Sequence, residues 1–314
     1  MSDKIYDLLI VGAGCSGASG AMYASRLNLD TIMVAELPGG LITTTHLVEN
    51  WPGIKSISGP DLAMSIVDHA TSFGVPMKNE KVKEIVKAVD NVEDGKKSGY
   101  VVKTSSSEYK AKTVLIATGT EHKHLNVPGE KELANKGVSY CALCDGAFYK
   151  DKVVCTVGGG DSAAKEALLL TEYAKKVFIL VRGKKLKAEP VNLDRVEKNE
   201  KIEIMYETEI AEILGDEKVE KLKLKNGDDM EMDGVFIAIG HNALSKLAKD
   251  LQVGLNQWNE IKINRRSETS VPGIYSAGDV TDNEFKQAIT GSAEAVTAAY
   301  FASDYIAKNE IVFN

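Results

Sequence analysis

Two cysteines separated by two residues are the part of this chain best suited to chemistry. Cys141 and Cys144 lie in the segment Ser139–Gly146, and Asp145 directly follows the second cysteine. A Cys-x-x-Cys pair closes a small, easily reduced disulfide ring, and a nearby dipole or cation favours one thiolate. An adjacent carboxyl can act as general acid or base for the thiol proton. The segment therefore predicts a redox-active pair, with Asp145 as its proton carrier or as the cap of a helix that begins near Gly146.

Two other uses of the cysteine pair are consistent with the sequence. His122 and His124 would point the same way from a strand and could complete a zinc site, but they precede the pair and no second Cys-x-x-Cys follows. We therefore predict no metal. A structural disulfide is the other alternative, although only four cysteines and no export signal near the start favour a reducing, cytoplasmic compartment. Cys15 and Cys155 are interpreted as small core residues.

The composition is that of a folded protein whose partners are small molecules or other proteins. Of the 314 residues, 44% are hydrophobic and 26% are charged, and 38 basic against 45 acidic side chains give a net charge of −7. Nucleic acids and anionic membranes attract clustered Lys and Arg, so we expect neither as a partner. The apolar run near the start is interrupted by glycines and is too short to cross a membrane. At about 150 residues per domain, the length predicts two domains.

A glycine-rich turn near the start has the spacing of a dinucleotide site. Residues 6–36 contain a buried strand, then Gly12, Gly14 and Gly17, an alanine-rich helix, and a second strand that ends in Glu36. In such a unit the glycines allow a tight bend, a close approach to a pyrophosphate and close helix packing, and the helix N-terminus faces the phosphate charge. An acid about 20 residues beyond the motif accepts hydrogen bonds from ribose hydroxyls. The segment predicts a dinucleotide-binding βαβ unit.

The same order of elements recurs in the second half of the chain. Gly158 and Gly160 follow a buried strand, and Asp161, Ser162 and Ala163 lead into a helix. Alanine is an accepted variant of the third glycine in this motif. A second dinucleotide-binding unit is therefore predicted.

The second unit ends in cations where the first ends in an acid. Its second strand runs into a segment, Arg182 to Lys187, that contains four basic residues. A 2′-phosphate needs Arg or Lys at this position, so NADPH is favoured over NADH, with a solvated basic turn as the alternative. His241, which follows a later strand, either lines this nucleotide site or is a loop histidine without function.

The remaining patterns predict an α/β protein with two Rossmann-like dinucleotide-binding domains, the second inserted into the first. The first domain would consist of residues 1–120 and 247–314, and the second of residues 121–246. Two short connections between them would form a hinge. The expected elements are strands at 6–11, 31–36, 100–104, 109–112, 114–117, 152–157, 176–181, 202–206, 219–225 and 235–239, and helices at 18–26, from 161 to about 173 and from about 287 to 307.

Taken in order, these motifs resemble those of the low-molecular-weight thioredoxin reductases of bacteria and archaea, over nearly the whole chain. The resemblance rests on the first glycine turn, Gly39–Thr45 with Val48–Gly53, Ala117–Gly119, Cys141–Gly146, Gly158–Ala163, Ala238–His241, and Ala277–Val280 with Lys286–Ala288.

The resemblance implies FAD in the discontinuous domain and a redox pair on the inserted domain. Cys144 would accept electrons from the flavin, Cys141 would attack the disulfide of thioredoxin, and Asp145 would shuttle the proton. Members of the family are usually homodimers and rotate the inserted domain. The residues expected to bind cofactors are Gly12, Gly14, Gly17, Glu36, Gly39, Gly40, Leu41, Asn50, Gly119, Gly278, Asp279, Lys286, Gln287 and Ala288 for FAD, and Gly158, Gly160, Asp161, Ser162, Ala163, Arg182, Lys187 and His241 for the pyridine nucleotide.

The sequence departs from the family pattern mainly at the second nucleotide site. The family signature there is His-Arg-Arg-x-x-x-Arg, of which this chain keeps Arg182 and has Lys187 in the last position. Point charge survives, but bidentate recognition of a phosphate is weaker. Pro190 is expected to interrupt the helix that normally follows. At the flavin site Leu41 replaces the common Gln and Lys286 the common Arg, changes expected to tune FAD binding.

The leading interpretation is a flavoprotein that moves electrons from NADPH through FAD to the cysteine pair and then to thioredoxin. Because the phosphate signature is eroded, the same reduction driven by ferredoxin or a reduced deazaflavin is one alternative. The others are an oxygen-dependent dithiol oxidase and a non-catalytic flavoprotein that senses redox state.

Overall fold

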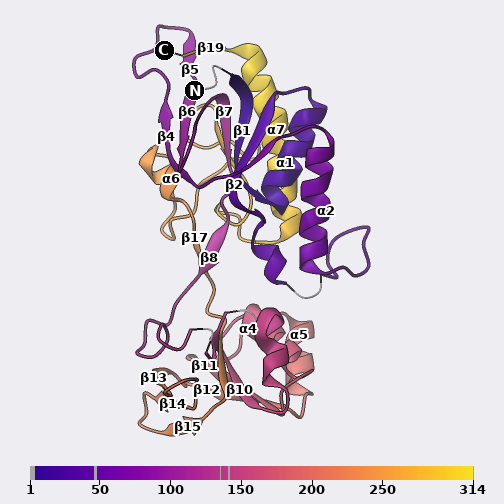
Figure 1. Cartoon of the computed structure of the whole chain (residues 1–314), viewed down its shortest axis with the longest axis vertical. Helices are drawn as coiled ribbons and strands as arrows, with labels where there is room; N and C mark the ends of the chain where they lie inside the picture. Colours follow the sequence, from indigo (N-terminus) through magenta and orange to yellow (C-terminus); the bar gives the residue numbers. More distant parts are fainter. Residues whose placement is uncertain (1–3, 46–47, 135, 141, 314) are drawn as a thin grey trace. The chain divides into compact units, whose positions relative to one another are not determined.

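The structure is a computed structural model that describes residues 4–45, 48–134, 136–140 and 142–313 (Figure 1). The chain divides into two compact units. Unit 1 consists of residues 1–121 and 243–314, and unit 2 of residues 122–242, so the segment that forms unit 2 is inserted into unit 1. These ends lie close to the 120/121 and 246/247 boundaries that the sequence suggests.

Unit 1 is built on a seven-stranded, mainly parallel sheet. Its strand order is β3-β2-β1-β7-β6-β4, and β18 also pairs with β7. Pairing is parallel around β1, β2, β3, β7 and β18, and antiparallel between β7, β6 and β4. The strands are β1 (Ile5–Gly14), β2 (Thr31–Gly39), β3 (Met77–Asn79), β4 (Val82–Lys87), β6 (Tyr100–Thr104), β7 (Glu108–Ile116) and β18 (Ile274–Ser276).

Three helices cover one face of this sheet. They are α1 (Cys15–Arg26), α2 (Gly59–Ser72) and α7 (Ala288–Lys308), which lie side by side in Figure 1. Alanines of α1 and α7, such as Ala21 and Ala298, belong to the same buried cluster as Leu8 and Ile10 of β1. Small side chains let the two helices pack closely, which brings the start of α7 to the start of α1.

The other face of the unit 1 sheet is covered by the tail of the chain. Leu9 and Val11 of β1 pack there with Leu247 of α6 (Lys246–Asp250) and with Ile261 and Val280. Strand residues therefore alternate between the two faces, as expected of a sheet buried on both sides. The smaller elements are η1 (Gly40–Thr44) and the parallel pair β5 (Lys96–Ser98) and β19 (Glu310–Val312).

Unit 2 contains a five-stranded parallel sheet and a small antiparallel sheet. The parallel sheet has the order β12-β11-β10-β16-β9, and α4 and α5 lie beside it. The elements are β9 (Val138–Ser139), α3 (Ala142–Asp145), η2 (Gly146–Tyr149), β10 (Val153–Val157), α4 (Asp161–Leu170), β11 (Lys176–Val181), α5 (Pro190–Glu197), β12 (Ile202–Tyr206), β13 (Ile210–Leu214), β14 (Lys221–Leu224), β15 (Asp229–Glu231) and β16 (Gly234–Ile237). The two connecting segments, β8 (Thr120–His122) and β17 (His241–Ala243), pair with each other.

The structure confirms both βαβ units and an α/β architecture with two parallel sheets. Two local predictions were wrong. The strands predicted at 109–112 and 114–117 are one strand, β7, which ends at Ile116, because Thr113 is buried and its hydroxyl donates to the carbonyl of Asp7, 2.7 Å away. Pro190 begins α5 and does not interrupt it, since the first helical position requires no N–H. A helix does begin at Gly146, as η2, and Asp145 is its N-cap residue by position, but the Asp145 side chain makes no capping hydrogen bond.

Several elements were not predicted, among them helices α2 and α6 and strands β13 and β15 of the small sheet. The middle strand of that sheet, β14, lies within the predicted strand at 219–225. Helix α2 begins after its N-cap Ser58, which accepts a hydrogen bond from the N–H of Asp61 at 3.1 Å. Cys15 and Cys155 are buried free thiols, as predicted. No helix of the described part of the chain is both long and apolar enough to cross a membrane.

Candidate functional site

The first glycine turn in unit 1 is closed by backbone contacts. Gly12 has φ +112°, and a Cβ added there would lie 2.2 Å from the carbonyl oxygen of Ala117. A Cβ on Gly17 would lie 1.9 Å from the carbonyl oxygen of Gly12. Only glycine fits at these two positions. Around Gly14 the space is more open, since the nearest atoms to an added Cβ are 3.6 Å away.

The open side of this turn faces the start of α1. Gly14 is the N-cap residue of α1, which has no acidic residue in its first turn and no capping hydrogen bond from any described side chain. The first N–H groups of a helix are donors that its own carbonyls do not satisfy, and they carry partial positive charge. This is the arrangement that receives a pyrophosphate, so the turn fits the cofactor that its sequence predicts.

Glu36 lies near the end of β2 and is exposed. Its Oε2 lies 3.0 Å from Nζ of Lys81, and both side chains are largely open to solvent. An exposed pair of this kind contributes little to stability, so the carboxylate can exchange this partner for the hydroxyls of a ribose.

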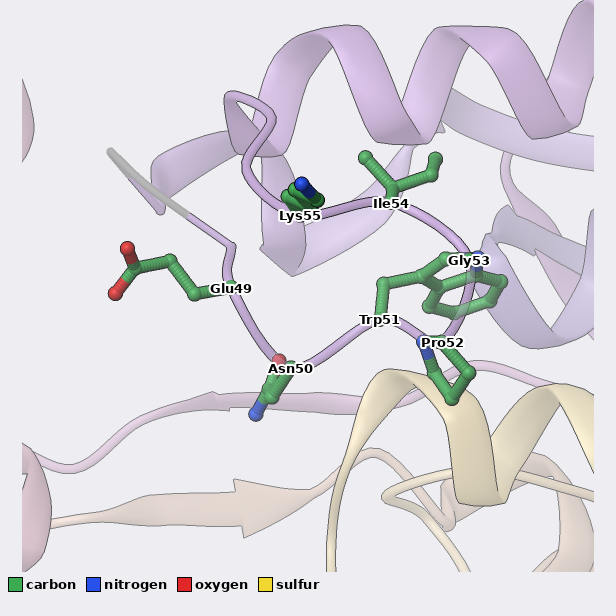
Figure 2. A pocket seen from close by; sticks show the side chains of 7 residues that line it. All are labelled: Glu49, Asn50, Trp51, Pro52, Gly53, Ile54 and Lys55. Carbon is green, nitrogen blue, oxygen red and sulfur yellow. The ribbon is translucent and has the colours of Figure 1, made fainter.

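A loop brings Asn50 to the start of α7. Asn50 Nδ2 donates to Oε1 of Gln287 at 2.9 Å, and Gln287 is the N-cap residue of α7. Figure 2 shows the loop Glu49–Lys55, which borders an open hollow of about 530 Å³. The structure thus joins two residues that the sequence assigns to FAD, from segments far apart in the chain.

The loop that carries Asp279 is held by Glu294, a residue of α7 that sequence reasoning missed. Oε2 of Glu294 accepts from the N–H of Gly278 at 2.8 Å, and Oε1 accepts from Asn283 Nδ2 at 2.6 Å. The hydroxyl of Thr281 lies 3.4 Å from Oε2. The Thr281 hydroxyl donates more closely to the carbonyl of Gly278, at 2.8 Å, so the carboxylate satisfies two donors of the loop and lies near a third. Glu294 is the only acidic residue in the first half of α7, and this isolated charge is the feature of the sequence that could have identified it.

Lys286 fixes the far end of the same loop. Its Nζ donates to the carbonyls of Asp279 at 3.0 Å and Thr281 at 2.7 Å, and lies 2.8 Å from Oε1 of Glu260. All three donors of the ammonium are engaged within the protein. The structure places Lys286 as a brace of the loop, whereas the sequence suggested a contact with the cofactor.

Burial controls the charged groups at this end of unit 1. It raises the pKa of Asp279, while Lys286 partly opposes the shift. Burial also raises the pKa of Cys15 to about 11, and the Asp279 carboxylate adds to that increase. Cys15 is therefore a protonated, unreactive thiol at neutral pH, and Asp279 lies close to the first turn of α1.

The other predicted flavin residues border the same glycine turn or lie at strand ends. Gly14 of β1 is paired with Gly39 of β2, and a Cβ on Gly40 would lie 2.9 Å from Cα of Gly14. Leu41 follows in η1, and its carbonyl accepts from the hydroxyl of Thr44 at 2.8 Å. Beyond β7, the carbonyl of Gly119 accepts from the N–H of Leu244. Ala288 is the first residue of α7.

The redox segment lies in unit 2 on a one-turn helix. Cys141 lies outside the described residues, and of Cys144 the structure describes the backbone, within α3. Asp145 ends α3 and is half-buried. Its charge contributes to a raised pKa of Tyr149, after the larger effect of burial. The next helical turn exposes 74% of Phe148, so an apolar side chain stands in solvent four residues after Cys144.

A second buried glutamate, also missed from the sequence, anchors the strand that leads to Cys141. Glu130 is 1% exposed, and its Oε1 accepts from the hydroxyl of Tyr140 at 2.7 Å and from the N–H of Leu125 at 3.0 Å. His124 Nδ1 lies 2.7 Å from the same hydroxyl. Burial favours the neutral acid, but the hydrogen bonds outweigh it and keep the pKa of Glu130 below its usual range. The carboxylate therefore fixes the residue that precedes the redox pair.

The second glycine turn accommodates the side chain of Ala163 at the position where the first turn has Gly17. A Cβ on Gly158 would lie 2.3 Å from the carbonyl oxygen of Ala238 and 2.9 Å from the existing Cβ of Ala163. Gly160, the N-cap residue of α4, has no atom within 4 Å of an added Cβ. Ser162 is exposed in the first turn of α4. The turn is open where a diphosphate would approach.

Asp161 ties the second turn to α5. Its Oδ1 accepts from the N–H of Glu189 and from Asn192 Nδ2, both at 2.9 Å, and its Oδ2 lies 2.7 Å from Nζ of Lys165. Partial burial works to raise the pKa of Asp161, but these hydrogen bonds lower it below the ordinary value. The sequence assigned Asp161 to the nucleotide, and the structure shows it bonded to its own protein.

The basic segment after β11 is attached to the same turn. The N–H of Lys187 donates to the carbonyl of Gly159 at 2.8 Å. Arg182, Lys185 and Lys187 are exposed, and their charged groups form no ion pair with any described residue, whereas Nζ of Lys184 lies 3.9 Å from Oε1 of Glu207. Free cations therefore stand beside a turn that can receive a diphosphate.

His241 meets His122 where the two connecting strands pair. Their ring centroids are 4.8 Å apart, and the ring of His122 lies 5.7 Å from that of Tyr140. Burial lowers the pKa of both histidines, with Lys123 adding to the effect at His241. No motif indicates this pairing, because it depends on the register of two strands that are distant in the chain.

Comparison with known proteins agrees with the geometry. The family model "Pyridine nucleotide-disulphide oxidoreductase" matches residues 6–295. The thioredoxin reductase of Bacillus subtilis is 42% identical over 311 residues, which cover 97% of this chain and 96% of that protein. The crystal structure of Lactococcus lactis thioredoxin reductase matches with a TM-score of 0.89 and 32% identity, covering 96% of this chain and 99% of the other.

A further solved structure is a ferredoxin-flavin thioredoxin reductase from Clostridium acetobutylicum. It matches with a TM-score of 0.52 and 30% identity, over 97% of this chain and 99% of the other. The match to the family model spans most of the chain, and the identity to the Bacillus subtilis enzyme extends over nearly its full length. The chain therefore belongs to the pyridine nucleotide-disulphide oxidoreductase family, as a flavoprotein of the low-molecular-weight thioredoxin reductase type.

Proposed function

We propose that this protein moves electrons from NADPH through FAD to a Cys141–Cys144 disulfide and then to thioredoxin. The observation that carries the proposal is that the redox helix α3 and the next turn pack against α4, the helix that begins at the second glycine turn. An added Cβ on Gly146 would lie 3.4 Å from Leu170, the last residue of this helix, and 3.4 Å from Tyr173 in the turn that follows it. One helix thus serves the nucleotide turn at its start and the redox segment along its side.

In unit 1 the protein binds and orients the cofactor. FAD, when bound, supplies the transfer of an electron pair between nicotinamide and disulfide. The N–H groups at the start of α1 would hold its pyrophosphate, and Glu36 would hold its ribose. The rest of the FAD would be positioned by Asn50, Gln287 and the loop that Glu294 braces, since these converge on the starts of α1 and α7.

In unit 2 the chain handles the disulfide and the proton. We assign Cys144 as the sulfur that receives electrons and Cys141 as the one that attacks the partner disulfide. Asp145, half-buried beside them, would give or take the thiol proton. A Cys144→Ser protein that still reduced thioredoxin at the native rate would refute the assignment of that sulfur.

The proposed acceptor is a thioredoxin-like protein. A protein partner needs an apolar contact near the reacting sulfurs, and Phe148 offers one, with 74% of its surface exposed beside the redox helix. The Bacillus subtilis relative is a thioredoxin reductase, so its name gives the same class of partner. Phe148→Ala should raise KM for thioredoxin while leaving the reduction of the enzyme by its donor unchanged.

The proposed donor is NADPH. Arg182 and Lys187 stand beside a turn whose Gly160 is open, and the net charge of a 2′-phosphate would draw it to these cations. A relative that takes electrons from ferredoxin has a similar fold, so the donor has to be tested directly. We further propose a homodimer, in which the exposed Tyr23 and Tyr300 of α1 and α7 would be covered.

The deciding experiment is an anaerobic titration of the yellow holoenzyme with four donors: NADPH, NADH, reduced ferredoxin and a reduced deazaflavin. The absorbance of the oxidised flavin is followed after each addition. Rapid bleaching by NADPH, slower bleaching by NADH and subsequent reduction of thioredoxin are expected. If neither pyridine nucleotide bleaches the flavin but ferredoxin or deazaflavin does, the NADPH assignment is overturned. The proposed reduction of thioredoxin would then still stand.

A further inference from the structure

A carboxyl group on α4 is hydrogen-bonded to the backbone of the redox helix. The N–H of Ala142, the residue between Cys141 and the rest of α3, donates to the carboxyl of Glu166. The other carboxyl oxygen, Oε2, is buried and has no hydrogen-bond partner among the described residues. Sequence reasoning did not single out Glu166, because it occupies an ordinary position in an alanine- and leucine-rich helix.

Glu166 lies on the face of α4 that packs against the redox segment. Glu166 and Leu170 are spaced as i and i+4 on α4, and Leu170 lies against Gly146, as does Tyr173 from the turn that follows the helix. An apolar residue at 166 would continue this packed face. A buried carboxyl with an unpaired oxygen costs folding free energy instead, and such groups occur preferentially where a site uses their charge or proton.

The environment makes this carboxyl titrate in the physiological range. Burial raises the pKa of Glu166 to about 8, and the hydrogen bond from Ala142 opposes the shift without cancelling it. The group is therefore mostly neutral below pH 7 and gains a negative charge as the pH rises through 8. A disulfide carries no charge, whereas a reduced pair with a lowered thiol pKa carries a thiolate that this carboxylate would repel.

We propose that Glu166 is a positioning residue of the redox pair: it fixes the first amide of α3, and its negative charge makes the Cys141–Cys144 disulfide harder to reduce. The inference rests on the proposed function, because it takes the pair to be redox-active. The charge of Glu166 would hinder reduction of the disulfide least below pH 8 and most above pH 8.

Other titratable groups lie on the elements packed against α4, which are α3, η2, α5, β10 and β11. They are Cys144 and Asp145 on α3, Tyr149 on η2, Cys155 on β10, Lys176 on β11, and Asp194, Arg195 and Glu197 on α5. Asp161 and Lys165 share α4 itself and pair with each other. A substitution confined to Glu166 leaves all of these in place, so a difference between variant and parent reports on Glu166.

The test compares the parent holoenzyme with Glu166→Gln in dithiothreitol redox buffers between pH 6 and pH 9.5. Glutamine keeps an oxygen that can accept from Ala142 but cannot ionise. The fraction of reduced Cys141 and Cys144 is measured by alkylation and mass spectrometry. Below pH 7 the two proteins should agree. Above pH 8 the variant should be reduced more readily, on the order of tenfold in the equilibrium constant, or about 30 mV for a two-electron couple.

Two further variants separate charge from position. Glu172→Gln makes the same chemical change at an exposed residue just after α4 and should follow the parent curve at every pH. Glu166→Ala also removes the acceptor for Ala142 and should slow thioredoxin reduction about tenfold at pH 7, where Glu166→Gln remains near the parent rate. Flavin absorbance and melting temperature confirm that each variant is folded.

The outcomes distinguish this inference from the function on which it rests. Parent and Glu166→Gln curves that superpose from pH 6 to 9.5 would overturn the role of Glu166 while leaving the redox pair in place. A parent protein whose two cysteines fail to exchange with dithiothreitol at any pH would overturn the proposed function and the inference together.

Discussion

The two glycine turns of this protein follow one plan but are held in place differently. In unit 1 the turn is closed so tightly that an added Cβ on Gly17 would lie 1.9 Å from a backbone oxygen, and a carboxylate on another helix, Glu294, braces the neighbouring loop. In unit 2 the third position is Ala163, and the brace is Asp161 within the turn itself. The first turn therefore depends on residues from the end of the chain, whereas the second is tied to α5, which follows it closely in the chain.

The two turns also differ in the charge that follows the next strand. Glu36 ends the first unit with an acid suited to ribose hydroxyls, and Arg182 begins a basic segment in the second. A duplicated scaffold thus presents opposite charges to two nucleotides. The proposed function would account for this difference, with FAD as the resident cofactor in unit 1 and NADPH as the exchanging donor in unit 2.

The largest effect should come from Gly17→Ala, which tests the tightness of the first turn. The methyl group would meet the carbonyl of Gly12, so α1 or β1 has to move. We expect a loss of roughly 3 kcal/mol of stability in unit 1 and purification without flavin. Absorbance near 450 nm and the melting temperature check both.

The matched control for that substitution is Gly160→Ala in the second turn. No atom lies within 4 Å of the added Cβ, and Gly160 has φ −118°, which an alanine adopts without strain. Melting temperature and flavin content should stay at parental values. Equal damage from both substitutions would contradict the contrast drawn between the turns.

A smaller effect is expected from Glu294→Ala, which removes the external brace of the first unit. The N–H of Gly278 and the amide of Asn283 lose their acceptor, which costs about 1–3 kcal/mol where such donors stay buried. FAD affinity should fall about tenfold, as measured by flavin release during dialysis. Glu284→Ala, at an exposed position of the same region, should retain FAD like the parent.

The sequence predicted the elements that local pattern controls. Strands β1, β2, β10 and β11 are continuous apolar runs next to glycine motifs, and such runs specify a buried parallel strand almost alone. The one-turn helix α3, which precedes η2, was not predicted because the residue before it in the sequence, Cys141, is not one of the usual N-cap types.

The residues that support the sites could not be found in the same way. Glu130, Glu166 and Glu294 each bond to a segment that is distant in sequence or lies on another element. No motif surrounds them, and an isolated glutamate is usually exposed, whether in a turn like Glu130 or in a helix like Glu166 and Glu294. Their roles follow only from the packing of helices and strands, which sets which backbone N–H groups lack a partner.

Lys187→Ala tests the difference in charge between the nucleotide sites of the two units. If the ammonium recognises the 2′-phosphate, KM for NADPH should rise about five- to tenfold while KM for NADH stays unchanged, because NADH lacks that phosphate. Steady-state kinetics with both nucleotides provide the measurement. Lys175→Ala, an exposed lysine before β11, should change neither constant. An equal rise for both nucleotides would place Lys187 away from the 2′-phosphate.

The smallest effect concerns the internal brace of the second turn and depends on pH. The pKa of Asp161 is held below its ordinary value of 3.8 by Lys165, Asn192 and the N–H of Glu189, against the opposing effect of burial. Because the folded-state pKa is the lower one, the ionised carboxylate stabilises the fold above about pH 4, and this stability is lost as the pH falls through the folded-state value. Asp161→Asn should therefore lower the melting temperature of unit 2 at pH 7, and the gap from the parent should narrow steadily toward pH 3. Asp216→Asn, at an exposed loop position, should show no gap at either end of the range. A gap for Asp161→Asn that stays constant down to pH 3 would mean that the second turn is held by shape and not by this charge.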